Sequence, residues 1–232
     1  MNGSGTFFGV SVGPGDKDLL TLKAVKTLES AGCIAAPQSG GSRRMALDIV
    51  DEYIHDKKII DVCTPMTHDE SELARAHRQA AELIVDQLIQ GKDVAMVVLG
   101  DIGIYSTFHA IATHVMAAGF EVEIIPGVTS FCAAAAKLKI PLCQGQQSLL
   151  ITPACGGVDA ALNLDANCVL MKPSHDISEI RECLSAHGLL DHASAVSDVG
   201  HPDERIYRSL KDAPATLGYF SLVIVDKTAS RR

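Results

Sequence analysis

The stretch from 9 to 25, GVSVGPGDKDLLTLKAV, joins an apolar run, a glycine-rich turn and an amphipathic segment. This order is typical of loops that bind phosphate at a helix N-terminus. A GxxxxGK[ST] loop needs a lysine and a hydroxyl after its last glycine, and neither follows Gly15. The dinucleotide pattern GxGxxG also fails, because Asp18 stands where the third glycine belongs. The residue types therefore do not match either phosphate-binding pattern.

Two carboxylates sit where a phosphate would bind. The pattern predicts a helix over 17–30 with Asp16 as its N-cap and Asp18 in its first turn. These side chains would satisfy the free N–H groups and the positive end of the helix dipole. Two interpretations remain: a tight turn in which Pro14 and the glycines serve geometry alone, or a site for a ligand without phosphate.

Two further loops combine a strand end with glycine and hydroxyl residues. VVLGDIGIYST, 97–107, turns at Gly-Asp and then offers Tyr105, Ser106 and Thr107. IIPGVTSFCAAAA, 124–136, turns at Pro-Gly and offers Thr129 and Ser130 as helix caps. Because ligands of open α/β sheets bind outside the carboxyl ends of strands, we expect the three loops to converge on one crevice.

Short β-rich runs alternate with longer amphipathic ones, which predicts an α/β chain. We expect strands near 6–12, 32–36, 58–62, 93–99, 121–125, 147–152, 167–172, 193–199 and 219–226. We expect helices near 17–30, 42–55, 69–91, 106–118, 129–138, 158–164 and 176–187. The strand at 93–99 is so uniformly apolar that both of its faces should be covered.

The strongest candidate for a domain junction lies around EVEIIPGVTS, 121–130, where a strand ends before an alanine-rich helix. This predicts an N-terminal α/β domain over 1–122 and a C-terminal α/β domain over 123–232. IPLCQGQQ, 140–147, is a second candidate hinge.

Composition narrows the function further. A formal net charge of −8 and the absence of tryptophan argue against a nucleic-acid binder. The N-terminus lacks the basic start of a signal peptide, and no apolar run is long enough to cross a bilayer, so we expect neither secretion nor membrane insertion. The 7 scattered cysteines indicate reduced thiols and a cytoplasmic location. The 9 histidines form no HxxxH or HxH pair, and we expect no protein-bound metal.

These segments together resemble the tetrapyrrole methylase family, enzymes that use S-adenosylmethionine to methylate uroporphyrinogen and corrin precursors. The resemblance rests on GVSVGPGDKDLLTLKAV, GDIGIYSTF, IIPGVTSFCAAAAKLKIPL, VLMK and YFSLVIVDK, which keep the family's order over nearly the whole chain. GDIGIYSTF and the SFCAAAA segment look most like the branch that methylates C-20 of precorrin-2 or its cobalt form.

The resemblance implies two α/β domains of the tetrapyrrole methylase type with the active site in the inter-domain cleft, usually in a homodimer. It implies S-adenosylmethionine as the methyl donor and a tetrapyrrole as the substrate. Carried over by motif, the donor contacts are Pro14, Leu99, Gly100, Asp101, Ile104, Thr129, Ser130, Met171 and Gly200, with Ser106 and Thr107 as additional ones. The sequence departs from the pattern at Ile102-Gly103, where a proline is usual, and at Pro37, where uroporphyrinogen-type relatives place an acid.

Methyl transfer from a sulfonium mainly requires that donor and acceptor carbon be aligned. Tyr105 is our candidate to assist departure of the proton, with water as the alternative. Because the substrate carries carboxylates, we expect Arg43, Arg44 and Lys172 to bind them, although a solvated helix start explains the arginines equally well. The alternatives are methylation at another ring position, a diphthine-type methylase acting on a protein side chain, and a non-catalytic tetrapyrrole or adenosine binding module on the same fold.

Overall fold

The structure is a computed structural model that describes residues 5–38, 45–67, 69–155, 157–173 and 176–227 of the 232 residues. The chain divides into two compact units, Met1–Thr129 (unit 1) and Ser130–Arg232 (unit 2). The division comes later than the junction expected after residue 122, because the strand Val122–Ile125 pairs with the first strand of unit 1.

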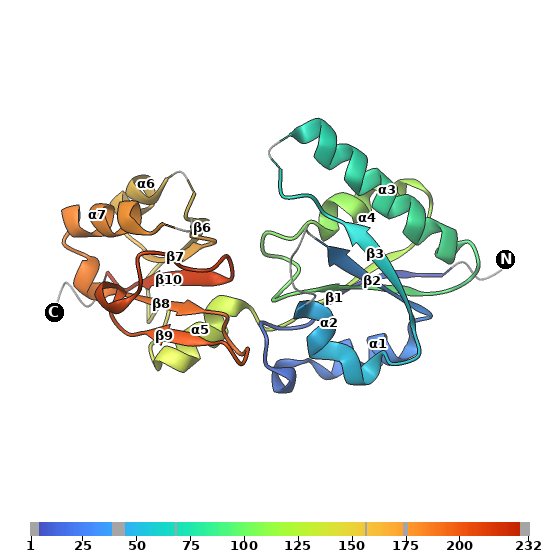
Figure 1. The fold of residues 1–232 in the computed structure, drawn as a ribbon, viewed down its shortest axis with the longest axis horizontal. Helices are drawn as coiled ribbons and strands as arrows, with labels where there is room; N and C mark the ends of the chain where they lie inside the picture. The colour runs from blue at the N-terminus through green and yellow to red at the C-terminus, as the bar shows by residue number, and fades with distance from the viewer. Residues whose placement is uncertain (1–4, 39–44, 68, 156, 174–175, 228–232) are drawn as a thin grey trace. The chain divides into compact units, whose positions relative to one another are not determined.

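Unit 1 is a parallel sheet between two layers of helices (Figure 1). The strands follow the order β3-β2-β4-β1-β5, and each pairs in parallel with its neighbour. In chain order its elements are β1 Phe7–Ser11, α1 Leu22–Ser30, β2 Cys33–Gln38, α2 Met45–Val50, β3 Lys58–Cys63, α3 Glu70–Leu88, β4 Val94–Val98, α4 Phe108–Ala117 and β5 Val122–Ile125.

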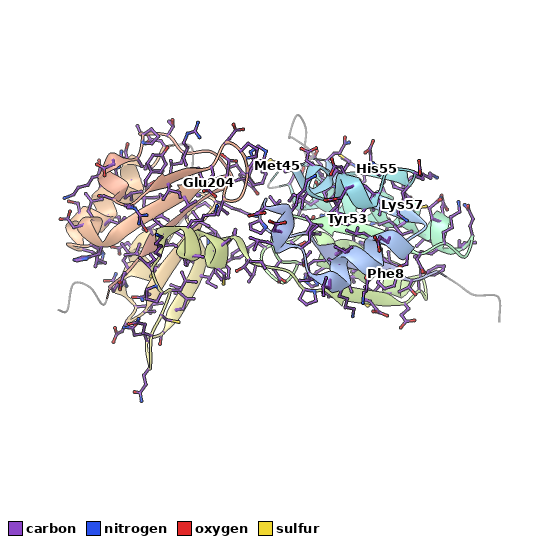
Figure 2. The ribbon with its side chains drawn as sticks, turned by 90° about the horizontal axis from the view of Figure 1, so that it is seen from below. Phe8, Met45, Tyr53, His55, Lys57 and Glu204 are labelled. Carbon is purple, nitrogen blue, oxygen red and sulfur yellow. The ribbon has the colours of Figure 1, made fainter. Side chains whose placement is uncertain are left out.

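Apolar side chains on the two faces of this sheet form two separate cores. The first includes Phe7 and Met96 and packs against α3 and α4. The second includes Val10 and packs against α1 and α2, where Phe8 and Tyr53 are partly buried (Figure 2). The expectation that the strand at 93–99 is covered on both faces is confirmed, since Val94 to Val97 of β4 are fully buried.

Unit 2 contains a second five-stranded sheet, with the order β6-β7-β10-β8-β9. β6 and β7 are parallel, whereas β10 runs antiparallel to both β7 and β8. One core joins this sheet to α6 and α7, and α5 packs against β10. The elements are α5 Ser130–Leu138, β6 Leu149–Pro153, α6 Val158–Asn163, β7 Asn167–Met171, α7 Ser178–Ala186, β8 Ala193–Ser197, β9 Arg205–Tyr207 and β10 Ser221–Val225.

The predicted α/β class and the nine predicted strands are confirmed, with two corrections to the elements. The first helix does not begin at Lys17: a 3-10 turn covers Lys17–Leu19, and α1 begins at Leu22, because Thr21 caps it by accepting from the N–H of Ala24. The strand β9 was not predicted, because its three residues are too few to show an alternating pattern.

Candidate functional site

The three glycine-containing loops of unit 1 meet at the carboxyl edge of its sheet. β4, β1 and β5 are neighbours in the sheet, so the segments that follow them lie side by side (Figure 1). Gly13 and Gly100 form a two-way backbone bridge: Gly100 N donates to Gly13 O at 2.7 Å, and Gly13 N donates to Gly100 O at 3.2 Å. The first two loops are therefore joined directly through their backbones.

Asp101 joins the second loop to the third. Its Oδ1 accepts from Gly103 N at 2.8 Å, and its Oδ2 accepts from Gly127 N, also at 2.8 Å. Hydrogen bonds to a charged acceptor are about twice as strong as neutral ones. Each carboxylate oxygen keeps a second lone pair, so Asp101 can hold the two loops and still accept from a ligand.

Ser11, at the end of β1, is a site residue that the sequence analysis missed. Its side chain is fully buried, and its Oγ accepts from Ile102 N at 2.9 Å. A Cβ on Gly127 would lie 2.6 Å from the Cβ of Ser11 and 3.0 Å from Gly100 O, so the third loop passes too close for a side chain. The available signal was a small polar residue ending the apolar run FFGVS.

The glycines of this edge adopt a backbone that other residues rarely reach. Gly13 has a φ of 74° and Gly100 a φ of 75°. A Cβ placed on Gly100 would meet nothing within 4 Å, whereas one on Gly13 would be in ordinary contact with Leu19. The backbone at Gly100 is therefore open to the close approach of a ligand.

The remaining donor candidates of unit 1 lie in or beside these loops. Pro14 is buried in the first loop, and Leu99 and Ile104 are partly buried in the second. Ser106 has a local role, because its Oγ accepts from Phe108 N at the start of α4. Thr107 precedes α4 without a side-chain cap bond, and Thr129 ends the unit after the Pro-Gly turn.

Tyr105, the candidate for proton transfer, projects from the second loop. The residue is 45% exposed, and its φ of 49° is unusual for a residue with a side chain. Strained backbone of this kind is common at functional sites.

The role expected for Asp16 needs a correction. Its carboxylate accepts from Asp18 N at 3.0 Å, so it does cap backbone, but the turn it caps is the 3-10 turn Lys17–Leu19. Thr21 caps α1 instead. Asp16 thus stabilises the loop between β1 and α1, and the helix start depends on another residue.

Unit 2 gathers its own candidates at one edge of its sheet. β7 and β8 run in the same direction on either side of β10, so Met171, at the end of β7, and Gly200, after β8, share an edge. The first residue after β7 is Lys172, whose Nζ lies 5.6 Å from the centre of the Tyr219 ring. Tyr219 and Phe220, 41% and 37% exposed, lead into β10 at the same edge.

Gly200 already has a partner for its backbone N–H. It donates to Oε2 of Glu204, which is labelled in Figure 2, at 2.7 Å, and the same oxygen lies 3.3 Å from the ammonium of Lys137. Ser130, the remaining donor candidate, begins α5. Arg43 and Arg44, the expected substrate cations, lie outside the described residues.

None of the helices in the described ranges combines the length and the apolar character that crossing a bilayer requires.

The chain is similar to known proteins over most of its length. The model of the family described as Tetrapyrrole (Corrin/Porphyrin) Methylases matches residues 6–214. A cobalt-precorrin-2 C(20)-methyltransferase from Salmonella typhimurium is 32% identical, with 97% of each chain covered. A precorrin-2 C(20)-methyltransferase from Sinorhizobium is 30% identical, with 96% of each chain covered.

Solved structures share the fold at lower identity. The X-ray structure of a cobalt precorrin-4 methyltransferase superposes with a TM-score of 0.75 at 22% identity, covering 95% of this chain and 94% of that one. A uroporphyrin-III C-methyl transferase from Thermus thermophilus, complexed with S-adenyl homocysteine, gives a TM-score of 0.70 at 18% identity, covering 98% of this chain and 100% of that one.

Proposed function

The chain belongs to the tetrapyrrole (corrin/porphyrin) methylase family, and we propose that it transfers a methyl group from S-adenosylmethionine to C-20 of precorrin-2 or cobalt-precorrin-2. Two relatives named for methylation at C-20 align along 96–97% of the chain, which supports this position on the ring over the others. One of these names includes cobalt and the other does not, so the proposal covers both forms of the substrate.

The observation that carries the proposal is the edge of unit 1, where three joined loops leave the backbone of Gly100 open beside the carboxylate of Asp101. The open backbone at Gly100 suits a ligand that approaches the main chain closely. Asp16 and Asp101 place negative charge in the same loops, which disfavours a phosphate and suits a cationic ligand. S-adenosylmethionine carries a sulfonium and an ammonium group, has no phosphate, and supplies the electrophilic methyl group.

The residues of this chain would act by binding and alignment. We propose that Pro14, Leu99, Gly100 and Ile104 contact the donor through backbone and apolar groups, and that Asp101 accepts from the donor's amino group with its second lone pairs. The further contacts carried over from the family are Ser106, Thr107, Thr129, Ser130, Met171 and Gly200.

Gly200 requires one refinement. Because Glu204 already accepts from the N–H of Gly200, we propose that Gly200 contacts the donor through its carbonyl oxygen, or that its missing side chain leaves room for the donor. The thioether of Met171 suits the face of an adenine ring.

We propose that Tyr105 assists loss of the proton from the methylated carbon, and that Arg43, Arg44 and Lys172 bind substrate carboxylates. Full turnover by Tyr105→Phe with unchanged substrate affinity would exclude the first role. Replacing both arginines by alanine should raise the KM for the tetrapyrrole and leave donor affinity unchanged. Equal weakening of both ligands would contradict their assignment.

We also propose that the chain works as a homodimer in the cytoplasm. All 7 cysteines are free thiols in the structure, which is consistent with a reducing compartment. Sedimentation of the purified chain tests the dimer, and a monomer at working concentration would contradict it.

Mass spectrometry of the reaction product tests the proposed function itself. The purified chain is incubated with S-adenosylmethionine and precorrin-2, with and without cobalt, while calorimetry measures donor binding. We expect a mass gain of one methyl group located at C-20. A methyl group elsewhere on the ring would favour another position, and donor binding without turnover would favour a binding module.

A further inference from the structure

The helices α6 and α7 pack together in unit 2 (Figure 1). Three side chains with different metal-ligating atoms meet there. Asp159 lies in the first turn of α6, and Cys183 and His187 lie four residues apart on α7 and its C-terminal cap. We call these three residues the α6–α7 cluster. Nε2 of His187 lies 2.8 Å from Oδ1 of Asp159, and Sγ of Cys183 lies 4.0 Å from the same oxygen. The three ligand atoms all lie within 4.8 Å of one another.

This set of atoms selects a particular class of ion. Thiolate, imidazole and carboxylate are the three side-chain ligands of Zn²⁺, whereas Ca²⁺ and Mg²⁺ take oxygen ligands. Zinc bond lengths place the ligand atoms of a tetrahedral site about 3.3–3.8 Å apart. The two separations from the Asp159 oxygen fall on either side of that range, so small side-chain adjustments would accommodate the ion.

The surroundings hold the cluster in place and favour a cation. Nδ2 of Asn163 donates to the second oxygen of Asp159 at 3.2 Å, which orients the carboxylate. The carboxylates of Asp159 and Glu179 both act on Cys183 electrostatically, so the cluster lies in negatively charged surroundings that attract a cation.

The end of α6 is fixed as well. Nζ of Lys227, a buried residue, donates to the carbonyls of Leu162 and Leu164 at 2.7 Å each. Asp159 is therefore presented from an anchored helix, and a site built on anchored helices needs little reorganisation to bind.

We propose that the α6–α7 cluster is a binding site for Zn²⁺ or a similar divalent transition metal, with Asp159, Cys183 and His187 as ligands and water completing the coordination. Binding releases the thiol proton of Cys183 to solvent and links α6 to α7 through the ion. No residue assigned to the donor or the tetrapyrrole belongs to the cluster. The expectation of no bound metal rested on the spacings between histidines and on those between cysteines. It did not consider a cysteine and a histidine four residues apart, as Cys183 and His187 are.

A zinc titration of the reduced, metal-free chain tests the proposal, with a chromophoric chelator as competitor. We expect one Zn²⁺ per chain. Losing an outer-shell partner already weakens metal sites about 10–100-fold, so losing a ligand in Cys183→Ser, His187→Gln or Asp159→Asn should weaken binding at least about 100-fold. Cys143→Ser and His192→Gln are matched controls in the same unit and should bind as the wild type does. Equal affinity in the wild type and Cys183→Ser would overturn the proposal, as would loss of binding in Cys143→Ser.

Co²⁺ gives a second readout that reports the sulfur ligand directly. The wild type should show a thiolate-to-cobalt charge-transfer band, which Cys183→Ser loses and Cys143→Ser keeps. Asp159 is exposed, so Asp159→Asn should fold normally and separates loss of a ligand from loss of structure. Thermal unfolding of each metal-free variant checks this, and methyl transfer should be unchanged in all of them. A cobalt band that persists in Cys183→Ser would also overturn the assignment.

Discussion

Both units place a positive φ within two residues of a strand end, but they use different residue types to do so. In unit 1 the residues are Gly13 and Gly100, with φ of 74° and 75°. In unit 2 they are Lys172 and Asp198, with φ of 52° and 49°. A left-handed backbone costs a residue with a side chain about 1–2 kcal/mol, so unit 2 must hold this conformation by other contacts.

The contacts differ accordingly. In unit 1 the two glycine backbones bond to each other, and the carboxylate of Asp101 bonds to two backbone N–H groups. In unit 2, Lys172 lies over Tyr219, Glu204 accepts from Gly200 N, and the backbone N–H of Asp198 donates to Phe220 O. The edge of unit 1 is therefore joined by bonds between backbone groups and by one carboxylate that accepts two of them, whereas the contacts of unit 2 include exposed side chains such as Tyr219. Breaking one contact should have a larger effect in unit 1.

Asp101→Ala should have the largest effect. It removes the acceptor of two backbone N–H groups, each bonded to a charged oxygen, and should destabilise unit 1 by about 3 kcal/mol. Donor affinity should fall as well, because the second and third loops are no longer joined. Chemical denaturation and hydrogen exchange at Gly103 and Gly127 measure the first effect, and calorimetry with S-adenosylmethionine measures the second.

Two variants serve as controls for this prediction. Asp101→Asn keeps one acceptor oxygen and should lose about half as much stability. Asp18→Ala removes an exposed carboxylate from the first loop and should change stability by less than about 0.5 kcal/mol. Equal stability of Asp101→Ala and Asp18→Ala would show that Asp101 does not connect the loops.

Gly127→Ala should have the next largest effect. Its Cβ would lie 2.6 Å from the Cβ of Ser11, so the third loop must move, at a cost of about 2 kcal/mol. Gly218→Ala in unit 2 is the matched control, because the nearest atom to its Cβ would be Oγ of Ser221 at 4.0 Å. The control should be neutral or slightly stabilising. Melting temperatures compare the two, and equal shifts would contradict the close packing at Gly127.

Most of the fold could be predicted because the strands are short apolar runs and the helices are strongly periodic. In unit 1 strands alternate regularly with helices, which also implies that the strands are parallel. The meeting of the three loops at one edge of the sheet therefore follows from the sequence. In unit 2 the last strand, β10, enters between β7 and β8 and runs opposite to both. No local pattern in SLVIV specifies that position or that direction.

A site residue could be predicted where a sequence motif includes it. It could not be predicted where its role depends on a hydrogen-bond partner far away in the sequence. Asp101 stands out in Gly-Asp after a buried strand, but its bond to Gly127 N joins residues 26 positions apart. Ser11 becomes informative only with Ile102 beside it, 91 positions away. Asp16 was expected to cap the helix, yet a 3-10 turn intervenes, because Thr21 offers a second cap five residues later.

Glu204→Ala tests the weaker connection of unit 2. It leaves the N–H of Gly200 without its carboxylate acceptor and removes the ion pair with Lys137, which should cost about 1 kcal/mol. Glu204→Gln keeps an acceptor for the N–H and loses only the ion pair with a half-exposed lysine, so its cost should be below about 0.5 kcal/mol. Chemical denaturation separates the two. A loss as large in Glu204→Ala as in Asp101→Ala would remove the contrast between the edges.

Asp198→Gly should have the smallest effect and the opposite sign. Glycine reaches a φ of 49° without steric cost, but it also gives the unfolded chain more freedom, so the net gain should be at most about 0.5 kcal/mol. The backbone bond from Asp198 N to Phe220 O is kept in the variant. Asp198→Ala is the control and should be less stable than the glycine variant, since alanine tolerates a left-handed backbone poorly. If the alanine variant is as stable as the glycine variant, the backbone at Asp198 is not strained. The difference from Gly100 would then lie in how closely a ligand can approach the backbone at each edge.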